Sequence, residues 1–124
     1  MNQIYTKSIV SIGSLTERFT ASQCNSLNVN PKVGDLVRIG FEISEGQKTR
    51  IQFYQGLVLA IKGTGITRNI LIRRSFKSFC SERIVLLNSP QIKEFNILTH
   101  NNVRRSKLYY VRQLQGKQAR ILAG

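Results

Sequence analysis

The residue types that do covalent chemistry are scarce and far apart in this chain. His100 is the sole histidine, and the two cysteines, Cys24 and Cys80, lie in segments of different character with no base close by in sequence. Spacing alone leaves open a nucleophile pair of Cys80 and His100, which we expect not to form. Free thiols in a reducing compartment are the simpler interpretation of both cysteines.

Other catalytic patterns are missing as well. A structural zinc site wants four Cys or His ligands in close pairs, whereas the chain has three such residues in total. The six acidic residues are isolated, which argues against a pair of catalytic carboxylates. Gly63-Thr64-Gly65 lacks the Gly-Lys-Ser/Thr of a phosphate loop and joins two predicted strands, so it predicts a turn. We therefore expect no enzyme, metal, cofactor or small-molecule substrate.

Positive charge is the dominant feature. Nineteen Lys and Arg residues face six Asp and Glu, a net charge of +13 that attracts polyanions. The segment from Asn101 to Ile121 holds six cations, no acid, and the pair Tyr109-Tyr110, and no acid follows Glu94 in the last 30 residues. A solvated face normally mixes signs, so this segment predicts binding to nucleic acid. Its cations are Arg104, Arg105, Lys107, Arg112, Lys117 and Arg120.

A second basic group surrounds the Gly63–Gly65 turn and the strand after it. It comprises Lys62, Arg68, Arg73, Arg74 and Lys77, which we expect to cluster at one end of the fold. Two interpretations of Arg73-Arg74 stay open: the pair contacts phosphate, or it lies at a strand end that faces solvent. The sequence contains no helix-turn-helix, zinc-finger or basic-zipper pattern and no RNP motif. This favours a structural RNA bound by charge and shape, with the tyrosines available for stacking.

The central part of the chain has the two-residue period of strands. Val37, Ile39, Phe41 and Ile43 alternate with polar residues or glycine, which predicts a half-buried strand. Gly56 lies inside the next strand, where we expect a bulge or a sharp bend. Five short strands joined by glycine turns favour a mainly β fold, a small closed or nearly closed antiparallel barrel. The further predicted strands are 50–62, 69–74, 83–87 and 91–99.

Two extensions flank this barrel, which we place at residues 31–100. Residues 1–30 form a variable N-terminal extension, with a short helix over 15–22 that Ser14 and Glu17 would cap. An organelle-targeting role is conceivable there, since acids are few. Residues 101–124 form the basic extension, in which Leu108, Val111 and Leu114 predict a helix from 106 that ends at Gly116. No apolar run approaches the ~20 residues of a membrane span, so we expect no membrane partner.

Several segments together resemble bacterial-type large-subunit ribosomal protein L19. They are VGDLVRI, EGQKTRIQFYQGLVLAIKG, the Glu82-Arg83 pair, NSPQIKEFNI and RRSKLYYVRQLQGKQARI, in the same order over Val33 to Ile121. The resemblance implies an SH3-like barrel with basic extensions and a structural, non-enzymatic role in the large subunit at its interface with the small one. Implied partners are large-subunit rRNA, ribosomal proteins L14 and L3, and small-subunit rRNA through inter-subunit bridges. The implied rRNA contacts are Arg104, Arg105, Lys107, Tyr109, Tyr110, Arg112, Lys117 and Arg120.

One departure from the family pattern is local. Family members carry Gly-x-Gly-Val-Glu-Arg before the fourth strand, whereas here Ser78-Phe79-Cys80-Ser81 precedes Glu82-Arg83. The 14 Ile and 9 Asn hint at an AT-rich genome. We therefore expect an organellar ribosome, mitochondrial or plastid, with the bacterial cytoplasm as the alternative. The rival function is a free RNA-binding accessory factor for ribosome maturation or translation.

Overall fold

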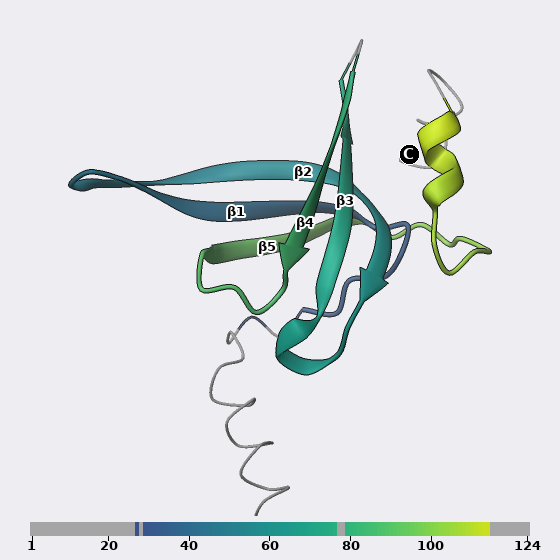
Figure 1. Cartoon of the computed structure of the whole chain (residues 1–124), viewed down its shortest axis with the longest axis horizontal. Helices are drawn as coiled ribbons and strands as arrows, with labels where there is room; N and C mark the ends of the chain where they lie inside the picture. The colour runs from purple at the N-terminus through teal and green to yellow at the C-terminus, as the bar shows by residue number, and fades with distance from the viewer. Residues whose placement is uncertain (1–26, 28, 77–78, 115–124) are drawn as a thin grey trace, which may run out of the picture.

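Five antiparallel strands make up the body of the protein (Figure 1). The computed structural model describes residue 27 and residues 29–76 and 79–114; the helix expected over 15–22 and the cations Lys77, Lys117 and Arg120 lie outside these ranges. All five predicted strands are confirmed. The elements are β1 (Leu36–Glu45), β2 (Lys48–Lys62), the 3-10 helix η1 (Gly65–Thr67), β3 (Asn69–Ser75), β4 (Cys80–Leu86), β5 (Ile92–Thr99) and the 3-10 helix η2 (Tyr109–Gln113).

The sheet is open, so the predicted barrel is wrong. Its strand order is β4-β3-β2-β1-β5, which leaves β4 and β5 as the two edges. β1 pairs with the last strand, from Leu36 opposite Thr99 to Phe41 opposite Ile92. Val85 of β4 and Phe95 of β5 nevertheless belong to one hydrophobic cluster. The twist and curl of the sheet bring the edge strands β4 and β5 over a common core. Side chains of both strands are therefore buried together although the strands do not hydrogen-bond to each other.

The second half of β2 is buried on both faces. Val58 faces the first cluster, while Leu57 and Leu59 face a second cluster on the other side. Successive side chains of a strand point to opposite faces of the sheet, so neighbouring residues of β2 enter different clusters. The first cluster consists of Val37, Ile39, Phe41, Val58, Ile70, Ile72, Val85, Ile92 and Phe95, and the second of Leu57, Leu59, Leu108 and Val111.

A bulge at Leu59 connects β2 to the C-terminal segment. Val58 pairs with Ile72 and Ala60 pairs with Leu71, so Leu59 has no partner of its own in β3. Its carbonyl instead accepts a hydrogen bond from the Leu108 N–H at 2.8 Å. The bulge thus lies three residues beyond Gly56, at which the sequence had predicted a bulge or bend; Gly56 itself pairs in regular register with Val37. It provides the backbone acceptor that holds the C-terminal segment on the sheet.

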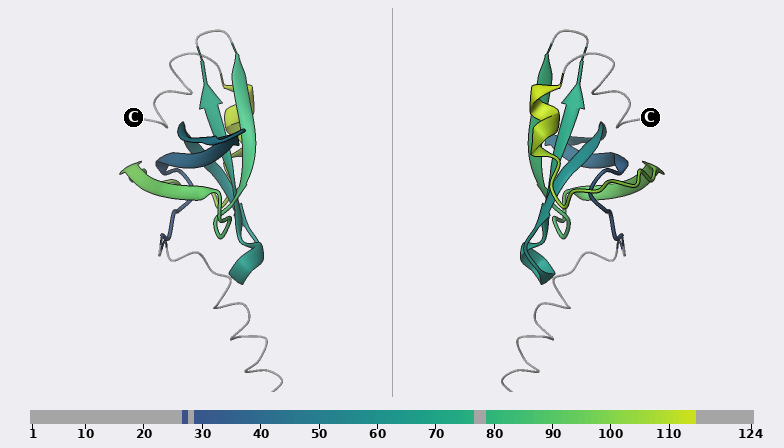
Figure 2. Two further views of the ribbon diagram at one scale, coloured as in Figure 1. Left: turned by 90° about the vertical axis from the view of Figure 1, so that its left-hand side faces the viewer. Right: turned by 90° about the vertical axis from the view of Figure 1, so that its right-hand side faces the viewer.

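The C-terminal segment forms a short 3-10 helix in place of the longer helix predicted from 106. Helix η2 spans five residues, and its N-cap Leu108 has φ −103° and ψ 37°, outside the helical region. Because a 3-10 helix has three residues per turn, Leu108 and Val111 lie on one side and both enter the second cluster. The bond from Leu108 to Leu59 fixes where the helix begins. Figure 2 shows η2 on the side of the sheet away from the projecting β1–β2 hairpin.

Gly56 marks a close approach between β2 and β3. A Cβ atom there would lie 2.5 Å from Ile72 Cγ2 and 2.7 Å from the Arg73 carbonyl oxygen. We predict that Gly56→Val lowers the free energy of unfolding by about 1–3 kcal/mol, because the β3 backbone must move to admit the side chain. Denaturation of the purified protein by urea measures this loss.

Gly46 provides the matched control for that substitution. It lies in the β1–β2 turn with φ +60°, and no heavy atom lies within 4 Å of the position that a Cβ atom would take there. Asparagine tolerates this left-handed conformation, so Gly46→Asn should cost less than about 0.5 kcal/mol. Equal losses for the two variants would contradict the close approach as the cause.

Candidate nucleic-acid interface

One carboxylate joins three elements at the base of the basic C-terminal segment. Glu82 of β4 accepts a hydrogen bond from Arg73 Nη1 of β3 at 2.9 Å. It also receives Arg112 of η2 in a bidentate pair, Nε to Oε1 at 2.8 Å and Nη2 to Oε2 at 2.7 Å. Two arginines predicted to bind RNA therefore share one anionic partner within the protein. Sequence patterns did not assign this role to Glu82, although an isolated acid among cations is a signal for it.

The pKa values follow from this pairing. The hydrogen bonds from Arg112 lower the pKa of Glu82 below its usual 4.5; burial opposes this in part, and the hydrogen bond from Arg73 lowers the pKa further. The contact with Glu82 raises the pKa of Arg112. The Arg73 side chain is 10% exposed, and its Nε has no hydrogen-bond partner among the described residues. Arg73 thus depends on Glu82 for the neutralisation of its charge.

The two tyrosines lie in different surroundings, each beside cations. Tyr110 packs against the second cluster, and Arg105 Cζ lies 4.7 Å from its ring centroid. Tyr109 has Arg112 Cζ at 5.0 Å and Lys62 Nζ at 5.9 Å. Lys62 of β2 is thereby joined to the C-terminal cations. We call Lys62, Arg105, Tyr109, Tyr110 and Arg112 the C-terminal basic surface.

The other predicted cations do not form one cluster. Arg68 precedes β3 and donates from Nη1 to Asn30 Oδ1 at 2.9 Å. Arg74 lies near the opposite end of β3, over the ring of Phe76 at 4.3 Å. Six residues of strand separate the two by about 20 Å, so the predicted clustering at one end is wrong. Arg104 and Lys107 are exposed beside the C-terminal basic surface.

Two partly buried contacts hold the start of the C-terminal segment. Asp35 is buried, accepts the Lys32 N–H at 2.8 Å, and lies 3.1 Å from His100 Nδ1. Asn101 Nδ2 donates to the Gly34 carbonyl at 3.0 Å. His100 therefore positions the chain, and Cys80 has another neighbour, Ser75 Oγ at 3.7 Å.

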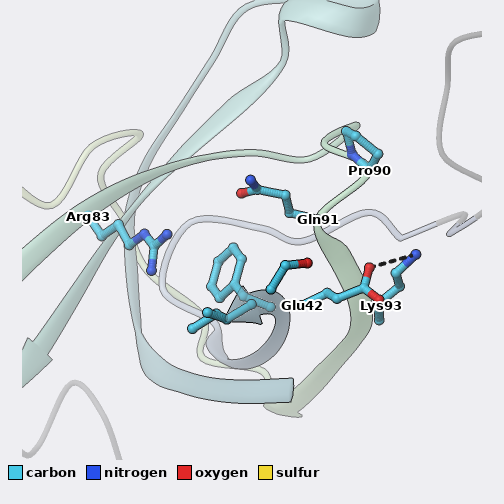
Figure 3. A pocket seen from close by; sticks show the side chains of 8 residues that line it. Glu42, Arg83, Pro90, Gln91 and Lys93 are labelled. Carbon is cyan, nitrogen blue, oxygen red and sulfur yellow. Dashed lines mark ion pairs between the residues drawn. The ribbon is translucent and has the colours of Figure 1, made fainter. Parts of the chain in front are cut away.

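An open pocket of about 580 Å³ lies between the ends of β1 and β5 and the side chain of Arg83 (Figure 3). In its lining, Lys93 Nζ and Glu42 Oε2 form an ion pair at 3.2 Å on the side away from Arg83. Arg83 Cζ lies 4.2 Å from the centroid of the Phe41 ring. The lining contains neither histidine nor cysteine, and its one carboxylate is already paired. Such a lining is polar and charged without an acid–base pair poised for catalysis.

The described residues provide neither a metal-binding cluster nor a membrane-spanning helix. These residues contain no group of three His, Cys, Asp or Glu side chains that could hold a metal ion. No helix in the same part of the chain is long and apolar enough to cross a membrane.

Comparison with known proteins relates the chain to one family. The family model described as Ribosomal protein L19 matches residues 14–123. The chain is 46% identical over 90 residues to the large ribosomal subunit protein bL19c of Thalassiosira weissflogii, covering 73% of this chain and 75% of that protein. It is 48% identical over 89 residues to bL19 of Thermosynechococcus vestitus, covering 72% and 74%. For bL19c of Rhodomonas salina the identity is 45% over 89 residues, covering 72% and 73%.

The Glu82 pairing generates a pH-dependent prediction. Glu82→Gln should lower the free energy of unfolding at pH 7 by about 1–3 kcal/mol, because Arg73 and Arg112 lose their charged acceptor. A carboxyl whose pKa is lowered in the folded state stabilises the protein above its unfolded pKa. The difference between wild type and variant should therefore shrink as the pH falls below about 4.5. Urea unfolding at pH 7 and pH 3, at constant ionic strength, measures it.

Glu45→Gln is the control for this prediction. Glu45 pairs with Arg50, and both side chains are well exposed. An exposed pair of this kind contributes about 0–1 kcal/mol, so the control should change little at either pH. A Glu82→Gln loss that stayed constant from pH 7 to pH 3 would contradict the ion pair as its source.

Proposed function

Because this chain belongs to the ribosomal protein L19 family, we propose that its C-terminal basic surface binds large-subunit rRNA while the sheet serves as a rigid support. The chain is a non-enzymatic, structural constituent of the large ribosomal subunit. The proposal concerns how it is held there. RNA phosphates supply the negative charge that a chain of net charge +13 lacks.

The anchoring of the C-terminal basic surface is the observation that carries this proposal. Leu108 is fully buried and bonded to β2, and Arg112 is clamped on Glu82. Cations held on a fixed support lose less conformational entropy on binding than cations on a free tail. Arg105 and Lys62 lie over the rings of Tyr110 and Tyr109, at 4.7 and 5.9 Å from the ring centroids.

We further propose the partners and the location. The exposed Arg104 and Lys107 extend the RNA-binding set, with Arg68, Arg74 and the sequence-predicted Lys77, Lys117 and Arg120 as further contacts. Ribosomal proteins L14 and L3, and small-subunit rRNA through inter-subunit bridges, are the proposed neighbours. Relatives named bL19c from algae and bL19 from cyanobacteria support a plastid ribosome over a mitochondrial one. The bacterial cytoplasm remains the alternative location.

Co-sedimentation and salt dependence test the mode of binding. The chain should stay with large subunits through a high-salt sucrose cushion in stoichiometric amount, whereas a free accessory factor would wash off. Neutralising Arg104, Arg105 and Lys107 together to Gln should reduce the slope of log affinity against log salt for naked rRNA by about 2–3, because up to three phosphate contacts are lost. Filter binding at several salt concentrations measures the slope.

A variant with the same loss of charge serves as the control. Arg38, Arg50 and Lys93 lie on β1, β2 and β5, away from η2. Their joint replacement by Gln removes three charges but should change the slope by less than about 1, since nonspecific attraction alone is reduced. Equal slopes for the two triple variants would mean that net charge, and not the C-terminal surface, binds the RNA.

We predict that Tyr110 stabilises the fold and that Tyr109 contacts the RNA. Tyr110→Ala should lower the free energy of unfolding by about 1–3 kcal/mol, since Tyr110 packs on the second cluster. Tyr109→Ala should spare folding and weaken rRNA binding by roughly 1–3 kcal/mol, the range for stacking on a base. Tyr→Phe at each position keeps the ring and should have little effect. Equal losses of stability with no separate effect on RNA would refute this division.

A further inference from the structure

The tip of the β3–β4 hairpin carries two exposed aromatic rings that the C-terminal basic surface does not use. Phe76 and Phe79 stack with ring centroids 4.8 Å apart and planes at 28°. They are 42% and 60% exposed. The Phe76 N–H donates to the Phe79 carbonyl at 2.8 Å, so the backbone holds both rings in place. A stacked pair of aromatic rings thus faces solvent near the end of the hairpin.

A cation extends this pair into a ladder along the hairpin. Arg74 Cζ lies 4.3 Å from the Phe76 centroid and 5.8 Å from the Tyr54 centroid. The Tyr54 hydroxyl contacts the Ser81 carbonyl oxygen at 3.3 Å, which ties the base of the ladder to β4. The carboxylate of Glu82 is occupied by Arg73 and Arg112. Among the described residues, the ladder of Tyr54, Arg74, Phe76 and Phe79 therefore carries net positive charge.

We propose that this ladder is a stacking site for an unpaired RNA base. The more exposed ring, Phe79, offers a face to the base, and the Arg74 guanidinium lies close enough along the ladder to meet an adjacent phosphate. A base pair inside a duplex cannot reach the ring because both of its faces are already stacked. The site therefore favours single-stranded over duplex RNA, through rings that are separate from the Tyr109 ring of the C-terminal basic surface.

An apolar pocket on a protein partner fits the ladder less well. Such a pocket would have to bury the guanidinium of Arg74 along with the rings, at the cost of removing a charge from water. RNA provides both the stacking surface and the counter-charge. This inference rests on the proposed function in taking RNA as the partner, and it adds which chemical feature of the RNA the tip contacts.

Fluorescence provides a direct test on the full-length chain. The chain has no tryptophan, so Phe79→Trp introduces a single reporter. The probes are single-stranded oligo(A) of about 12 nucleotides and a blunt RNA duplex of the same length, within the site sizes common for single-strand binders. Oligo(A) should quench the tryptophan emission, and the duplex, which exposes a base face only at its two ends, should quench it far less. Equal quenching by both probes, or none by oligo(A), overturns the proposal.

Loss of the rings gives the second test. Phe76→Leu with Phe79→Leu keeps apolar side chains and should weaken oligo(A) binding by roughly 5- to 50-fold, while duplex binding changes less than about twofold. Phe53→Leu is the matched control, because Phe53 is also exposed, at 40%, and also lies under an arginine, with Arg38 Cζ 4.1 Å from its centroid. An equal loss from Phe53→Leu would show a general aromatic effect and overturn the site.

Failure of this inference can be told apart from failure of the proposed function. If wild-type chain binds both probes and stays on large subunits in high salt, but the double Leu variant binds oligo(A) as tightly as wild type, only the tip proposal falls. If the double variant keeps its RNA affinity and no longer joins large subunits, the tip docks on protein, which also overturns it. If wild-type chain washes off large subunits, the proposed function itself falls.

Discussion

The hydrogen bond from Leu108 to the bulged carbonyl of Leu59 is the contact on which the functional arrangement depends. It places Leu108 and Val111 on Leu57 and Leu59, and so buries β2 on its second face. Together with the bidentate pair of Arg112 and Glu82, it fixes the cationic C-terminal residues on the sheet. A single irregularity in strand pairing therefore converts a basic tail into a shaped surface.

Electrostatic balance constrains the same region. A net charge of +13 opposes compaction, yet three arginines and a lysine gather around two tyrosines and one carboxylate. Glu82 offsets part of the local repulsion, and the aromatic rings offer the cations a favourable face without adding opposite charge. The remaining positive charge stays available to phosphates.

Sequence patterns predicted the strands well where one face is buried. The alternation of Val37, Ile39 and Phe41 located β1 because only a half-buried strand requires it. β4 was predicted to begin at Arg83 but begins at Cys80, since Cys80, Ser81 and Glu82 carry no apolar alternation that would indicate a strand. Closure of the sheet could not be judged either, because the accumulated twist of five strands decides it.

The candidate site was predictable in composition but not in arrangement. The cationic residues and the tyrosine pair stand out in the sequence, and the comparison with relatives supports the family they suggested. The clamp on Glu82 joins residues 9 and 30 positions apart, which no local pattern reveals. Whether an arginine is neutralised within the protein or left for a partner therefore becomes visible only in three dimensions.

The pairing of β1 with β5 has a consequence for biosynthesis. Leu36 lies opposite Thr99, so one edge of β1 stays uncovered until β5, the last strand of the sheet, has been synthesised. A nascent chain that ends before β5 exposes that edge to other unfinished chains. The docking of Leu108 and Val111 comes later still. In order of synthesis, the basic surface is therefore assembled last, after the sheet that supports it is complete.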